Sequence, residues 1–253
     1  MKRWVSLVIS GLLLISLAAC GTGGEDDPQQ TGPDGSPGVS QELLEDGSTA
    51  ETQVPGDGQE DLSQEEEEGS HILIAYFTWA DNTVVEDPSS VDVDATTSTS
   101  VLAPGNAAKL AAWIQEEVGG DLHSIVVEEP YSSDYDECLD RAAEEKADNA
   151  RPALATHVEN MEDYDIVFLG FPNWWYTLPM PVLTFVEEYD WSGKTVVPFV
   201  THGTGGLSST IRDLTAALPE DTTILEPIGV YRPEVDTSQG AVQDWLAGLN
   251  LEL

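Results

Sequence analysis

The chain has 253 residues, of which 47 are acidic and only nine are Lys or Arg, and its formal net charge is −38. Such a charge repels nucleic acids and anionic lipid surfaces and so excludes both as partners, whereas a basic protein or a high-salt habitat is compatible with it. With so few cations, an anionic ligand should be held by oriented backbone N–H groups more than by charged side chains.

The first twenty residues are typical of an export signal. Lys2 and Arg3 precede an apolar stretch over 5–17 that is too short to span a bilayer comfortably. One interpretation is an ordinary cleaved signal peptide. We favour a lipoprotein signal peptide over 1–20, because Leu17-Ala-Ala-Cys20 resembles the bacterial lipobox, in which the Cys is acylated. The mature protein would then be extracytoplasmic and lipid-anchored to the bacterial cell membrane through Cys20.

Residues 21–70 differ sharply in composition from the rest of the chain. They hold fifteen acidic residues and no basic ones, and they lack periodic apolar positions. Such a segment cannot bury enough apolar surface to offset the entropy of ordering it. We therefore predict an acidic disordered tether with a root-mean-square reach of about 40 Å, or more if its charges repel one another.

Residues 71–253 are predicted to form one α/β domain, because strands and helices alternate along them. The central strands are apolar on both faces, as expected for a parallel sheet that is covered on both sides. The helices show apolar residues at helical spacing. In chain order, the predicted strands are 71–77, 121–127, 164–171, 195–201 and 222–228, and the predicted helices are 106–118, 134–150, 178–189, 208–218 and 239–249.

The polar loop after the first strand reads Thr78-Trp-Ala-Asp-Asn-Thr83. Many α/β proteins bind a phosphate at such a point, where the next helix begins. Helical periodicity begins only at Asn106, which we expect to be the N-cap. We therefore predict a split phosphate loop made of Thr78-Trp79 and Gly105-Asn106-Ala107, with 84–104 as a surface insert whose role is open. The rival interpretation keeps Asp81-Asn82-Thr83 in the cradle.

Four segments, taken in order, resemble the flavodoxin-like family, and specifically the branch often found as bacterial lipoproteins. They are ILIAYFTW, PGNAAKLAAWIQEEVGGDLHSI, EEPYSSDYDECLDRAAEEKADNARP and YDIVFLGFPNWWYTLPMPVLTFVEEYDWSGKTVVPFVTHGTGG. The resemblance covers essentially all of 71–253. It implies a doubly wound five-stranded parallel sheet with strand order 2-1-3-4-5, and FMN bound at the carboxyl ends of strands one, three and four.

The resemblance also implies which residues hold the FMN phosphate. The family usually carries threonine where this chain has Ala107, so one hydrogen bond is missing, worth about 1.5–3 kcal/mol if nothing replaces it. Lys109, one turn further on, is a candidate replacement, although a solvated lysine is the simpler interpretation. The predicted phosphate-binding residues are Thr78, Trp79, Gly105, Asn106 and Ala107.

Two later loops are predicted to hold the flavin ring. Aromatic side chains after the third strand offer a flat wall on which the ring can stack, with Trp175 as the main candidate; the alternative is that one Trp belongs to the core and the other contacts a partner. Glycines after the fourth strand let backbone N–H groups approach the ring, and the alternative there is a flexible turn. The predicted residues are Pro172, Asn173, Trp174, Trp175, Tyr176, Thr201, His202, Gly203, Gly205 and Gly206.

No catalytic residue or metal site is predicted, because His71, His123 and His157 are scattered and Cys138 is interpreted as a partly buried helical thiol. Three functions stay open. The favoured one is an FMN-binding lipoprotein in extracytoplasmic electron transfer, with an unknown redox partner protein. The second is an FMN-dependent NAD(P)H quinone or nitro reductase, which is disfavoured because no separate nicotinamide motif is present. The third is a flavin-free binding module on the same scaffold.

Overall fold

The structure is a computed structural model, and it describes residues 71–92, 94, 101–249 and 251. The predictions for residues 1–20, including acylation of Cys20, and for the tether over 21–70 lie outside these residues. Within the described ranges, no helix has both the length and the apolar character that a membrane crossing requires.

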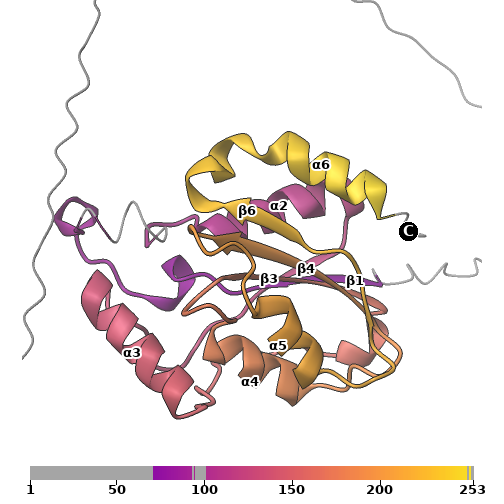
Figure 1. The fold of residues 1–253 in the computed structure, drawn as a ribbon, viewed down its shortest axis with the longest axis horizontal. Helices are drawn as coiled ribbons and strands as arrows, with labels where there is room; N and C mark the ends of the chain where they lie inside the picture. Colours follow the sequence, from indigo (N-terminus) through magenta and orange to yellow (C-terminus); the bar gives the residue numbers. More distant parts are fainter. Residues whose placement is uncertain (1–70, 93, 95–100, 250, 252–253) are drawn as a thin grey trace, which may run out of the picture. The chain divides into compact units, whose positions relative to one another are not determined.

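A parallel sheet forms the centre of the described domain (Figure 1). Its strand order is β2-β1-β3-β4-β5, with β6 also paired to β4, which confirms the predicted α/β fold class and the order 2-1-3-4-5. The strands are β1 (Ile72–Tyr76), β2 (Asp121–Ser124), β3 (Ile166–Pro172), β4 (Thr195–His202), β5 (Thr223–Ile224) and β6 (Ile228–Tyr231).

At the fifth position of the sheet, the sequence predicts one strand over 222–228, but the structure has two short strands there. β5 pairs with the first two residues of β4, and β6 pairs with Phe199–His202 of the same strand. Pro227 lies between the two segments and has no backbone N–H to donate to the ladder. The five strand positions are therefore filled by six segments, and β6 ends beside His202 at the carboxyl edge of the sheet.

The helices cover both faces of the sheet (Figure 1). α2 (Asn106–Val118) and α6 (Gln239–Gly248) lie on one face, whereas α3 (Tyr135–Ala147), α4 (Met180–Glu188) and α5 (Thr210–Ala217) lie on the other. The core is accordingly in two parts, because successive strand residues point to opposite faces: Ile74 packs in the cluster with α2, and Leu73 packs in the cluster with α4.

Helix ends follow local capping signals better than strand ends do. The Asp134 carboxylate accepts the N–H of Glu137 and caps α3, whose predicted start was 134. β2 ends at Ser124, before the predicted 127, because the chain leaves β1 and Val127 forms an antiparallel bridge with Leu154.

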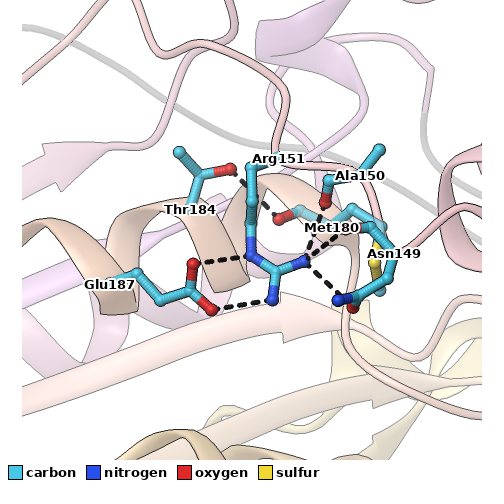
Figure 2. A network of polar contacts seen from close by, with 6 residues as sticks. All are labelled: Asn149, Ala150, Arg151, Met180, Thr184 and Glu187. Carbon is cyan, nitrogen blue, oxygen red and sulfur yellow. Dashed lines mark hydrogen bonds and ion pairs between the residues drawn. The ribbon is translucent and has the colours of Figure 1, made fainter.

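An arginine fixes the segment after α3 to α4 (Figure 2). The Arg151 Nε and Nη2 groups donate to the two Glu187 carboxylate oxygens at 2.8 and 2.7 Å. Its Nη1 group donates to the backbone oxygens of Asn149 and Ala150 at 3.0 and 2.9 Å. This two-pronged pair orients α3, which forms one wall of the cavity described below.

Candidate functional site

The two halves of the split loop are in contact. A Cβ added at Gly105 would lie 1.7 Å from the Thr78 Oγ1 atom and 2.8 Å from its Cβ. Only glycine fits there, because any side chain would push the end of β1 away from the start of α2. The insert between 84 and 104 therefore leaves the two halves adjacent, and Val101 near its end is buried.

The amino end of α2 offers free backbone donors. The Gly105 oxygen accepts the N–H of Lys109 at 3.0 Å, so Gly105 is the N-cap and the expectation that Asn106 caps the helix is wrong. The N–H groups of the first turn have no partner within the helix, and the N-cap residue, a glycine, has no side chain to cap them. The Lys109 ammonium is bound to the Asp236 carboxylate at 2.6 Å, so it is not available to replace the hydroxyl missing at Ala107.

The side chain of Asn82, which belongs to the alternative phosphate loop, binds backbone groups of the fold. Its Nδ2 donates to the backbone oxygens of Thr78 and Ile125 at 2.8 and 3.0 Å, and its Oδ1 accepts the N–H of Val127 at 2.8 Å. These bonds join the end of β1 to the end of β2. The Asn82 side chain is buried and has no remaining polar atom directed at a ligand, so the geometry favours the split loop.

Of the predicted tryptophans, Trp79 is buried in the core and Trp174 is partly buried against it. Trp79 is 1% exposed, and its indole N–H donates to the Ser132 oxygen at 3.0 Å. Trp174 packs edge-on against Phe77 and Tyr131, with ring centroids 5.4 and 5.3 Å apart. Both rings form a rigid floor beneath the loop after β3.

Trp175 and Tyr176 form the tip of a tight hairpin. Trp174 and Thr177 exchange two backbone hydrogen bonds of 3.0 Å, and the two tip residues have φ angles of 48° and 68°. A turn of this kind usually carries Asn-Gly, since left-handed angles cost an ordinary residue about 1–2 kcal/mol. Strain of this type is concentrated at binding sites. The Trp175 and Tyr176 side chains are 40% and 65% exposed.

The tip is held from two sides. On the α3 side, the Trp175 indole N–H donates to the Leu139 oxygen at 3.0 Å, and Lys146 Nζ donates to the Trp175 oxygen at 2.5 Å. On the other side, a Cβ at Gly205 would lie 3.5 Å from the Tyr176 ring, so the aromatic tip and the loop after β4 are in contact.

The glycine loop after β4 is bound to the loop after β3. The Asn173 backbone N–H donates to the Thr201 oxygen at 2.8 Å, and its Nδ2 donates to the Gly206 oxygen at 2.6 Å. His202 Nδ1 lies 2.8 Å from the Gly203 oxygen, which fits the tautomer that donates from Nδ1. These bonds hold the segment in place and argue against a flexible turn.

Two adjoining cavities lie at this edge of the sheet, and they share Asn173, Trp174 and Arg232. The first is lined by Asn106, Pro172, Asn173, Trp174, Thr201, His202, Gly203 and Arg232. The second is lined by Trp79, Asn173, Trp174, Trp175 and Arg232, together with Tyr135, Cys138, Leu139 and Ala142 of α3. The three predicted loops therefore meet in one region, while Thr78, Gly105, Ala107, Tyr176, Gly205 and Gly206 lie outside these linings.

Sequence reasoning missed Arg232 and the α3 wall. Arg232 directly follows β6. Because the predicted strand ended at 228, the prediction did not place Arg232 at the carboxyl edge of the sheet. A signal was available: parallel strands of this fold end at the ligand edge, and Arg232 is a rare cation in an acidic chain. Cys138 of α3 is 5% exposed, and burial raises the pKa of its thiol to about 12, so it is protonated at neutral pH.

In the part of the chain that the structure describes, no group of three His, Cys, Asp or Glu side chains could hold a metal ion.

Comparison with known proteins identifies the family. The model of the flavodoxin family matches residues 95–246, which is more than half of the chain. The chain belongs to the flavodoxin family. The matched segment begins after β1, so the first half of the split loop precedes it. No curated protein matches the sequence.

Two solved structures with TM-scores above 0.5 resemble this chain. A protein assigned as a flavoprotein from Bacteroides eggerthii is 30% identical, with a TM-score of 0.55 over 72% of this chain and 98% of its own. Another protein with the same assignment, from Bacteroides uniformis, is 25% identical, with a TM-score of 0.52 over 71% of this chain and 99% of its own.

Proposed function

We propose that this protein binds FMN and carries electrons outside the cytoplasm, attached to the membrane by a lipid on Cys20. The observation that carries the flavin part is the contact between Gly105 and Thr78, where a Cβ would lie 1.7 Å from a side-chain oxygen. This contact places the loop after β1 beside the amino end of α2, whose first N–H groups have no partner within the helix. The same edge of the sheet carries the strained aromatic tip. The assignment of both Bacteroides structures as flavoproteins supports a flavin as the ligand.

The residues at this edge fit FMN chemically. Backbone N–H groups at the start of α2 would bind the phosphate, and the exposed rings of Trp175 and Tyr176 would stack on the flavin. Asn173 would hold the loop after β4 beside the flavin ring, because it already donates to the Thr201 and Gly206 oxygens. When bound, FMN supplies the electron chemistry, and the protein contributes orientation, burial and charge.

The flavin part is tested by colour and by fluorescence. Protein purified with Cys20→Ser, which removes the lipid site, should show flavin absorption bands, or its tryptophan fluorescence should be quenched by added FMN. Neither signal would appear in a flavin-free binding module, and that result would refute the proposal. A flavin-loaded protein that consumes NAD(P)H with a quinone would instead be a reductase.

The location is tested separately. The unmodified protein should incorporate a labelled fatty acid and sediment with membranes, whereas Cys20→Ser should do neither. Labelling that persists in the variant would place the lipid elsewhere. The redox partner is expected to present a basic surface, because the chain carries a formal charge of −38.

A further inference from the structure

Arg232 differs from the other cationic side chains of the described residues. Lys109, Arg151 and Arg212 pair with carboxylates, and so does Arg141. Lys146 and Lys194 donate to backbone oxygens. The guanidinium of Arg232 makes no hydrogen bond or ion pair with any residue that the structure describes, in a chain with 47 acidic residues and nine Lys or Arg. An arginine that pairs with no carboxylate among the described residues keeps its donors for another anion.

The position of Arg232 places this cation in the candidate site. Arg232 lines both cavities, and in one of them it shares the lining with Asn106, the first residue of α2. A Cβ added at Gly203 would lie 3.4 Å from the Arg232 Cζ and Nη1 atoms. The guanidinium therefore lies over the start of the loop after β4, facing a cavity that the amino end of α2 also borders.

The backbone that carries Arg232 is fixed to the same helix. Arg232 begins the short helix η4 (Arg232–Thr237), in which Val235 is 1% exposed and packs in the cluster with α2. The Asp236 carboxylate binds Lys109 Nζ, in the first turn of α2, at 2.6 Å. The backbone of Arg232 is therefore fixed to α2, whose amino end is the proposed phosphate site. This fixed position limits the entropy that the guanidinium loses on binding.

The distribution of charge in FMN indicates which of its groups Arg232 binds. The oxidised flavin ring is neutral, so the phosphate is the anionic part of FMN. Phosphate also matches the planar fork of a guanidinium, which can donate two parallel hydrogen bonds. The cradle lacks a hydroxyl at Ala107, and Lys109 is occupied by Asp236. A net charge of −38 would otherwise repel the phosphate.

We propose that Arg232 binds the FMN phosphate, in place of the hydroxyl missing at position 107, and makes the site selective for FMN over riboflavin. The inference rests on the proposed function, since it assigns one residue of the same site. It predicts that the charge of Arg232 matters only for the phosphorylated ligand.

The test compares dissociation constants for FMN and riboflavin, measured by tryptophan quenching at one salt concentration. Arg232→Gln should weaken FMN binding roughly ten- to hundredfold, as expected for a lost charge-assisted bond, and leave riboflavin binding within about twofold. Arg232→Lys should retain part of the selectivity, since it keeps the charge and loses the fork. Arg212→Gln, which removes a cation bound to the adjacent Asp213, is the matched control and should change neither constant.

The outcomes separate this inference from the proposed function. If the unmodified protein binds FMN and Arg232→Gln leaves its affinity unchanged, the role of Arg232 is refuted alone. Equal weakening for FMN and riboflavin also refutes it, because Arg232 would then act on the ring or on the fold. If the unmodified protein binds neither ligand, the proposed function is refuted and this inference with it.

Discussion

Trp175 and Tyr176 adopt backbone angles that their side chains disfavour, with φ of 48° and 68°. Tyr176 is 65% exposed, so little burial offsets this cost. Tyr176→Gly should therefore stabilise the protein by about 1 kcal/mol, measured by urea unfolding. The same variant should weaken FMN binding, because it removes a ring from the wall.

Two companion variants separate strain from stacking. Tyr176→Asn should also stabilise the fold, since Asn tolerates left-handed angles, and should weaken FMN binding as the glycine does. Tyr176→Phe keeps both the ring and the strain and should change neither quantity. A glycine variant that unfolds more easily than the unmodified protein would contradict the strain argument.

Gly105 is the second residue whose geometry has a direct consequence. A Cβ there would meet Thr78 Oγ1 at 1.7 Å and Thr78 Cβ at 2.8 Å. Gly105→Ala should destabilise the fold by about 1–3 kcal/mol through overpacking, and it should lower FMN affinity because α2 moves away from the loop after β1. Unfolding curves and fluorescence titration measure the two effects.

Two control variants test whether the contact with Thr78 causes the effect of Gly105→Ala. Gly240→Ala adds a Cβ in open space on α6 and should be neutral or stabilising by up to about 1 kcal/mol. Thr78→Gly combined with Gly105→Ala removes the side chain that the new Cβ meets and should recover part of the stability. If the double variant is no more stable than Gly105→Ala, the contact with Thr78 is not the cause.

At the scale of elements, local signals predicted the helices well. α2 begins and ends where its apolar spacing indicated, and α3 begins after Asp134 as a capping residue requires. Strand ends depend on the neighbouring strand, so the early end of β2 and the break between β5 and β6 could not be read from one segment. Arg232 was missed for this reason: its place in the site is set by β6 and by the pair between Asp236 and Lys109.

The ion pair between Arg151, in the segment after α3, and Glu187 of α4 makes a prediction about pH (Figure 2). The hydrogen bond from Arg151 lowers the pKa of Glu187 in the folded state. A lowered pKa contributes stability above the unfolded value of about 4.3, and this contribution is lost as the pH falls through the folded value. Glu187→Gln should therefore cost at most about 1 kcal/mol at neutral pH, because the pair is partly exposed.

The pH series provides its own control. The difference in unfolding free energy between Glu187→Gln and the unmodified protein should shrink as the pH falls below about 4.3 and should vanish only below the lowered folded pKa of Glu187, where both proteins carry a neutral group. Glu162→Gln, in the short helix η3 (Met161–Asp163), serves as a matched acidic variant, since no partner is shown for its carboxylate among the described residues. A difference that is constant across the series would show that the pair acts by packing alone.

For the whole molecule, the balance of 47 acidic against nine basic residues predicts how stability responds to salt. Raising the ionic strength from 0.1 M to 1 M shortens the Debye length from about 10 Å to about 3 Å, which screens repulsion among the carboxylates. The ion pairs weaken as well, but exposed pairs contribute little. Stability should therefore rise with NaCl, and each gain of about 1 kcal/mol would raise the Tm by roughly 2–4 °C. At pH about 4, where many carboxylates are protonated, the rise should be smaller; a Tm that falls with salt would mean that attraction outweighs repulsion.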